Sequence, residues 1–338
     1  MSPSPKGLRL AFVIGGAVLA ALLLTLGVVY AVVTSQRTPQ LTAAAFLDEV
    51  VAGDATAALQ QVTGLAPASR GLLGDDMFAS ATDRITGYTI DEKAIELDTT
   101  AGTASVVVDV VQGDETYTQN IELVRVSRDV GLFDVWRVSA ASLPTVAFTY
   151  SSPDTMGLAV NGTELSSLDG SGSYRLPVLP GTYDFEATGV TEWVTADPAV
   201  AIARFDNSPV IEIPVVLSEA GTASAQSAVD ATLDACIAQA TLAPQPNCGF
   251  FITQDDATYT NIRWSLVTRP TVSFSPYTAG RGWEVVSESS GSMRMDADFT
   301  RGSESGTAEG SVDNFSQAGW ITSVTEEGTA LFESVTYE

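Results

Sequence analysis

The sequence predicts an α+β protein with a single transmembrane helix and a small β-sandwich between two mixed domains. Three observations support this fold class. Residues 10–33 contain no charge, apolar residues recur at helical spacing soon after positions 39 and 219, and apolar and polar residues alternate along most other segments. The predicted parts are a tail (1–9), a membrane helix (10–33), an α+β domain (38–143), a β-sandwich module (144–218) and a C-terminal α+β domain (219–338).

The uncharged segment at residues 10–33 is long enough to cross a membrane. A helix rises about 1.5 Å per residue, so the segment exceeds the ~30 Å hydrocarbon core of a bilayer. Lys6 and Arg9 precede it and Arg37 alone follows closely. This bias predicts a single-pass protein of the cell membrane with a cytoplasmic N-terminus and an extracellular C-terminal part. The alternative is a cleaved signal peptide, whose apolar core is typically about 7–15 residues and ends in an Ala-x-Ala site.

The composition is strongly acidic, with 41 Asp and Glu against 16 Lys and Arg and a formal net charge of −25 at pH 7. Nucleic acid is excluded as a partner, because a protein that binds phosphates needs a basic surface. Long-range electrostatics favour a neutral or cationic ligand over an anionic polymer.

In the first domain, helical spacing precedes strand alternation. Pro39 suits a first helical turn, Gly53 ends that helix, and Asp54 is placed to cap a second short helix. We expect a loop at residues 67–76. Alternating patterns then predict four strands, at residues 85–97, 103–111, 116–126 and 133–139.

The same domain carries a resemblance to a known family. Residues 38–142 contain the segments FLDEVVAGDATAALQQV and FDVWRVS, in an order that resembles the NTF2-like domains of bacterial single-pass membrane proteins. The resemblance implies a curved sheet wrapped around helices as a cone, which in some relatives binds a small ligand or catalyses proton transfer. It makes Asp109 and Tyr117 candidate ligand-binding residues, although the histidine that such relatives often use is absent.

The middle module lacks helical periodicity and reads as a β-sandwich. Strands are predicted at residues 146–150, 158–160, 174–178, 183–188, 199–205 and 210–216. Asn161-Gly162 predicts a type I′ turn and Pro180-Gly181 a type II turn. The segments LAVNGTEL and YRLPVLPGTYDFEA resemble PEGA-type modules that lie close to the cell wall.

The C-terminal domain begins with a predicted helix whose apolar stripe includes Val229, Leu233 and Cys236, continuing to Ile237 and Ala240. Strands are predicted at residues 258–267, 271–274, 283–287, 292–300, 307–312, 320–325 and 331–337.

The only two cysteines, Cys236 and Cys248, predict a disulfide, because an even count in an oxidising compartment favours pairing. Two free thiols are the alternative. We expect no metal site, since two thiols without histidine fall short of the usual four zinc ligands.

Most catalytic chemistry is excluded by what the chain lacks. There is no histidine for an imidazole triad, and no phosphate loop or dinucleotide fingerprint. We therefore expect no catalytic residue and no cofactor. The acidic pairs at residues 75–76 and 255–256 could support carboxylate chemistry, but their turn-like contexts favour capping.

One span followed by these modules resembles the TcaA-type envelope proteins of Gram-positive bacteria, without their zinc ribbon. The leading hypothesis is a non-enzymatic, membrane-tethered binding or scaffold protein of the cell envelope. Its partner would be an envelope protein, a wall component or a small neutral or cationic ligand. The alternative is a membrane-anchored enzyme of NTF2-like or carboxylate-hydrolase type. Converging Asp, Tyr and Arg side chains in the cone would favour the enzyme, and an apolar filling would favour the scaffold.

Overall fold

The computed structural model describes residues 38–67, 71–129, 133–165, 171–244, 248–253 and 255–335. Segment 10–33, which was predicted to span the membrane, lies outside these residues. Among the described residues, no helix combines the length and apolarity needed to cross a bilayer.

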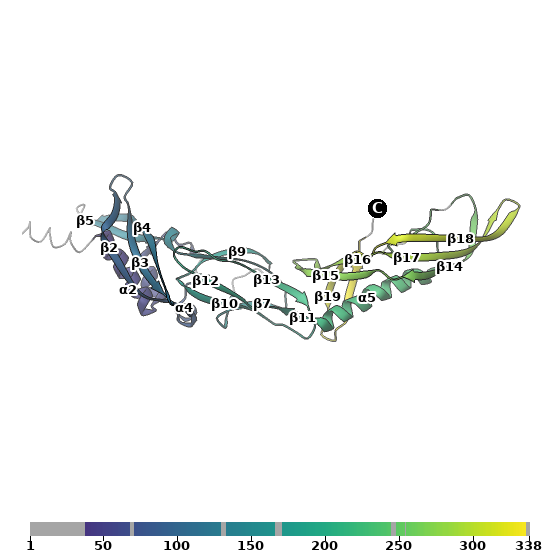
Figure 1. The fold of residues 1–338 in the computed structure, drawn as a ribbon, viewed down its shortest axis with the longest axis horizontal. Coiled ribbons are helices and arrows are strands. Elements are labelled where there is room, and N and C mark those ends of the chain that lie inside the picture. The colour runs from purple at the N-terminus through teal and green to yellow at the C-terminus, as the bar shows by residue number, and fades with distance from the viewer. Residues whose placement is uncertain are drawn as a thin grey trace, which may run out of the picture. The chain divides into compact units, whose positions relative to one another are not determined.

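The described chain is mostly β, with 20 strands in five sheets and four α-helices (Figure 1). The predicted α+β fold class, with an NTF2-like cone and a second α+β domain, is therefore wrong. Helices do begin near residues 39 and 219, as their apolar spacing predicts, but they make up a small part of the chain. The long alternating runs that follow it pair into sheets, and these sheets dominate the fold.

The described residues divide into two compact units. One holds the chain up to Val146 together with Leu176–Tyr183 and Ile202–Pro209, and we call it unit 1. The other, unit 2, holds Ala147–Arg175, Asp184–Ala201 and the chain from Val210 onward. The domain boundaries at residues 144 and 219 stay predictions.

Unit 1 begins with the two expected helices, α2 (Pro39–Ala52) and α3 (Ala55–Gln60). Gly53 ends α2 with a left-handed φ of 84°, as a C-terminal glycine commonly does. The Asp54 side chain accepts a hydrogen bond from the backbone N–H of Ala57 and so caps α3. Both helix predictions are confirmed. A third helix, α4 (Asp75–Ser80), begins inside the segment predicted as a loop.

A five-stranded sheet follows, in the order β1-β5-β4-β3-β2. Its strands are β1 (Val62–Thr63), β2 (Ile85–Asp98), β3 (Thr103–Gln112), β4 (Glu115–Asp129) and β5 (Phe133–Ser139). Helix α2 packs against this sheet. The interior is apolar and includes fully buried Phe46, Leu47, Val50, Val106, Val108, Val110, Ile121 and Leu123.

The middle strands form two four-stranded sheets, β12-β10-β7-β8 and β11-β13-β6-β9. Their bounds are β6 (Thr145–Ser151), β7 (Gly157–Val160), β8 (Thr163–Glu164), β9 (Ser171–Pro177), β10 (Gly181–Thr188), β11 (Val194–Ala196), β12 (Ala199–Ala203) and β13 (Val210–Leu217). Phe148 of β6 contacts Phe185 of β10, with ring centroids 5.1 Å apart, so the two sheets pack face to face.

The two turns predicted in this region had different outcomes. Asn161 and Gly162 have φ values of 48° and 77°, as a type I′ turn requires, and that prediction is confirmed. Gly181 has no positive φ and begins β10, so the predicted type II turn at Pro180-Gly181 is wrong.

The C-terminal part of unit 2 consists of helix α5 (Glu219–Ala238) and two sheets, β14-β17-β18 and β15-β16-β19-β20. Their strands are β14 (Thr258–Thr268), β15 (Thr271–Thr278), β16 (Gly282–Ser289), β17 (Gly291–Arg301), β18 (Glu304–Phe315), β19 (Gly319–Val324) and β20 (Ala330–Ser334). Val229, Leu233 and Cys236 of α5 are buried as predicted, whereas Ala240 lies beyond the helix and is exposed.

The predicted disulfide between Cys236 and Cys248 is confirmed. It joins the last turn of α5 to the segment that precedes β14. The two cysteines pack in an apolar cluster with Leu242, Phe250 and Trp264 on one face of the β14-β17-β18 sheet. The bond therefore fixes the segment that covers this face.

Replacing both cysteines by serine is expected to lower the free energy of unfolding by about 2–4 kcal/mol, because the closed loop restricts the unfolded chain. Urea unfolding of C236S/C248S beside the wild-type chain measures the change. A reductant should reproduce it in the wild-type chain and leave the double variant unaffected. An intact mass that does not rise by two hydrogens on reduction would contradict the bond.

Candidate binding site

The two residues that the sequence singled out as ligand-binding candidates lie on opposite faces of the sheet in unit 1. Asp109 pairs with Thr118 in the β3–β4 register, and Tyr117 pairs with the next residue of β3, Val110. Because neighbouring residues of a strand point to opposite faces, the two side chains cannot line one cavity. Asp109 is exposed, and its carboxylate accepts a hydrogen bond from the Thr118 hydroxyl.

Tyr117 belongs to a buried polar network within unit 1. Its hydroxyl donates to Gln112 Oε1 at 2.9 Å and accepts from the backbone N–H of Phe205 at 3.4 Å. Gln112 Nε2 donates to the carbonyl of Ala203 at 2.9 Å. The Arg204 guanidinium lies over the Tyr117 ring, 4.1 Å from its centroid. These contacts tie β3 and β4 to residues 203–205 and give Tyr117 a structural role.

Burial raises the pKa of Tyr117 to about 12, since it disfavours the phenolate. The charge of Asp206 acts in the same direction, while the hydrogen bond from Phe205 and the charge of Arg204 oppose it. The hydroxyl is therefore protonated at neutral pH, and it donates to Gln112 in that form.

The acidic pairs at residues 75–76 and 255–256 are used for local structure. The Asp75 carboxylate accepts from the hydroxyl and the backbone N–H of Thr56, each at 2.7 Å, and these bonds lower its pKa. The pKa of Asp255 is lowered by the backbone N–H two residues later and by Arg301, which also pairs with Asp256. A general acid needs a raised pKa, so neither Asp75 nor Asp255 suits that role.

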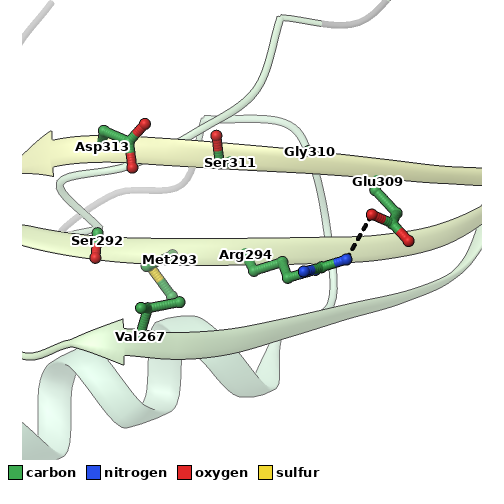
Figure 2. Close-up of a pocket in the computed structure, with 8 residues that line it drawn as sticks. All are labelled: Val267, Ser292, Met293, Arg294, Glu309, Gly310, Ser311 and Asp313. Atoms are coloured by element: carbon green, nitrogen blue, oxygen red, sulfur yellow. Dashed lines mark hydrogen bonds and ion pairs between the residues drawn. The ribbon is translucent and has the colours of Figure 1, made fainter.

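The clearest candidate site is an open cavity of about 420 Å³ on the β14-β17-β18 sheet (Figure 2). Its lining combines five charged or hydroxyl side chains with three residues that carry no polar side chain. The lining residues are Val267, Ser292, Met293, Arg294, Glu309, Gly310, Ser311 and Asp313.

Strand register positions the polar side chains of this cavity. In the β17–β18 pairing, Ser292 is opposite Asp313 and Arg294 is opposite Ser311, so all four lie on one face of the sheet. A register irregularity between Leu266 and Thr268 of β14 leaves Val267 without a partner on β17. Val267 is 67% exposed and forms an apolar patch beside the polar side chains.

The charges in the cavity leave one carboxylate uncompensated. Arg294 forms an ion pair with Glu309, visible in Figure 2, and a longer one of 3.8 Å with Asp296. Within the part of the chain that the structure describes, Asp313 makes no ion pair. With one guanidinium and two carboxylates in its lining, the cavity is net acidic and suits a cationic group.

Strand β18 forms a free edge beside the cavity. It pairs with β17 along its whole length, from Glu304 opposite Arg301 to Phe315 opposite Gly291. Among the described residues it pairs with no other strand. An unpaired edge offers a row of backbone N–H and C=O groups to another strand.

No protein-family model, curated protein or solved structure matches this chain. The resemblances to NTF2-like, PEGA-type and TcaA-type proteins therefore have no support beyond the segments that suggested them.

The sequence reasoning did not single out the residues of the cavity. Alternation along residues 292–300 and 307–312 was recognised, and it places Arg294, Glu309 and Ser311 on a polar face once the register is known. Gly302 supplies that register, because its φ of 60° fits the tight turn between β17 and β18. A hairpin with its turn at Gly302 would have predicted that Asp313 lies opposite Ser292.

Tyr117→Phe is expected to destabilise unit 1 by about 1–3 kcal/mol, because the buried Gln112 oxygen loses its donor. Urea unfolding monitored by fluorescence measures this loss. Tyr259→Phe removes a hydroxyl that donates to the exposed Asp255 carboxylate, and it serves as the matched control. Little change in stability is expected there, because water can replace an exposed hydrogen bond. Equal effects of the two substitutions would mean that the buried network contributes nothing.

Alkaline pH is expected to destabilise unit 1 through the same phenol. The folded state keeps the proton of Tyr117 up to about pH 12, whereas an unfolded tyrosine loses it near pH 10. The stabilisation is fully present below pH 10 and is lost as the pH rises towards 12, by at most ~3 kcal/mol. Unfolding measured across this range should show a weaker pH dependence in Tyr117→Phe.

Proposed function

We propose that this chain is a non-enzymatic binding module of the cell envelope that captures an extended, basic polypeptide segment along β18. The main observation behind this proposal is that the free edge of β18, a strand of 12 residues, lies beside a net-acidic cavity on the same sheet. Segment 10–33 would tether the module in the membrane, with the remainder outside the cell.

The edge of β18 supports binding by strand addition. In that mode, main-chain hydrogen bonds provide affinity and pockets for alternate side chains provide specificity. β18 contains no proline, so no backbone N–H group is missing from its edge.

Charge selects the class of partner. Glu304, Glu309 and Asp313 lie along β18, so a second copy of this acidic strand would meet like charges. Opposite charges across a strand pair are favourable, which points to a segment rich in lysine or arginine. Glu309 and Asp313 share a face about 13 Å apart, at ~3.3 Å per residue. A partner with basic residues four positions apart would match this spacing.

The filling of unit 1 supports a binding or scaffold role over an enzymatic one. The face of its sheet against α2 is filled mainly by valine, leucine and phenylalanine side chains, and Asp109 points away from it. The buried polar residues on that face, Tyr117 and Gln112, bond to each other and to the backbone of residues 203 and 205. An apolar filling was the sequence criterion for a scaffold.

The test is titration of the full-length chain in phospholipid nanodiscs with a labelled peptide of alternating threonine and lysine, followed by fluorescence anisotropy. Binding is expected to weaken by about tenfold in Asp313→Asn and to fall as salt rises, because the contact is between opposite charges. Asp109→Asn removes the same charge in unit 1 and is the matched control.

A peptide with N-methyl groups on alternate residues tests strand addition without altering the protein. It keeps the charges and removes backbone donors, so its affinity is expected to fall well below that of the parent peptide. Equal binding of the two peptides would exclude pairing with β18. Loss of binding in Asp109→Asn alone would move the site to the sheet of unit 1.

A further inference from the structure

A second cavity lies within unit 2 and has different chemistry. It has a volume of about 180 Å³ and lies where two loops of the sandwich meet the β15-β16-β19-β20 sheet. The loops contribute Thr155, Met156 and Thr191, and the sheet contributes Tyr277, Trp283 and Ser323. None of the residues that line the cavity carries a formal charge.

The walls of this cavity are held by specific contacts. The Trp283 indole N–H donates to the carbonyl of Val215 at 3.3 Å, and its ring meets Tyr277 edge to face at 5.0 Å. Gly189 has a φ of 73°, and a Cβ there would lie 2.6 Å from the carbonyl oxygen of Thr155. Only glycine lets the two loops approach this closely, so Gly189 fixes the loop side of the cavity.

We propose that this cavity binds one uncharged pyranose ring, either as a free sugar or as the end of a glycan. A cavity of ~150 Å³ holds a benzene molecule, so about 180 Å³ suits a single six-membered ring. A pyranose has apolar C–H faces and a rim of hydroxyls. It therefore matches a cavity whose lining includes the apolar side chains of Met156 and Trp283 as well as hydroxyl side chains.

Two hydroxyls are available to such a ring. Among the described residues, those of Thr155 and Ser323 form no hydrogen bond, and each can donate and accept. The Thr191 hydroxyl accepts from the backbone N–H groups of Trp193 and Val194, which leaves its own proton for another acceptor. A purely apolar occupant would offer these groups no hydrogen-bond partner, whereas a sugar hydroxyl can bond to each.

Charge in and around the cavity excludes an acidic sugar. The lining offers no cation to pair with a carboxylate, and burying an unpaired charge is costly. Asp154, beside Thr155, acts on Tyr277 through its charge and would repel an anion.

The experiment is saturation-transfer NMR on the full-length chain in phospholipid nanodiscs, since glycosidic detergents would compete. The probes are methyl glucopyranoside, glucuronate, a neutral disaccharide and toluene. The neutral glycoside is expected to bind at millimolar concentration and glucuronate at least about tenfold more weakly. Tighter binding of the disaccharide would identify a glycan end as the source, and equal binding a free sugar.

Ser323→Phe places a ring in the cavity and is expected to abolish the glycoside signal. Ser173→Phe, on the exposed face of β9, is the matched control and should retain it. Absence of a glycoside signal from the wild-type chain would overturn the proposal, whether or not the variants fold. Binding of toluene without the glycoside, or of glucuronate as strongly as the glycoside, would overturn it as well.

Discussion

The organisation of unit 2 depends on covering one face of the β14-β17-β18 sheet. Trp264, Met293 and Met295 point to that face and must be removed from water. A sheet with one apolar face cannot persist alone, and here α5 and the segment closed by the disulfide supply the cover. The opposite face is left to water, and it carries the polar side chains of the charged cavity. The candidate site thus follows from the direction in which the apolar residues of β17 point.

The sequence predicted local structure well where a residue acts on its immediate neighbours. Asp54 and Gly53 delimit helices through bonds within one turn, and Asn161-Gly162 fixes a hairpin through its own φ values. Such effects need no knowledge of distant parts of the chain. The Gly181 turn failed for the opposite reason. The next residue, Thr182, forms an antiparallel bridge with Thr82, which is distant in sequence, so Gly181 begins a strand.

The fold class and the site could not be predicted in the same way because both depend on pairing. Period-two alternation shows that Arg294 and Asp296 share a face, but not which strand lies beside them. Tyr117 was predicted to bind a ligand because the family resemblance implied a cone-shaped sheet. In the structure its hydroxyl bonds to Gln112, five residues away across a turn, and to the backbone N–H of Phe205, much later in the chain. The small helix α4 escaped notice because six residues carry little periodicity and no side chain caps its first turn, whereas Asp54 caps the equally short α3.

The make-up of unit 1 bears on how this protein could be rearranged in evolution. Its contiguous part ends near Val146, yet the partners of Gln112 and Phe46 come from residues 203–205, after the chain has passed through strands of unit 2 and returned. A gene segment that ended at the predicted boundary at residue 144 would leave the Gln112 amide and the Phe46 ring without these partners. Because unit 1 consists of three separate segments of the chain, the transfer of one contiguous gene segment cannot move it to another protein. It would be inherited together with the sandwich strands that lie between its segments in the sequence.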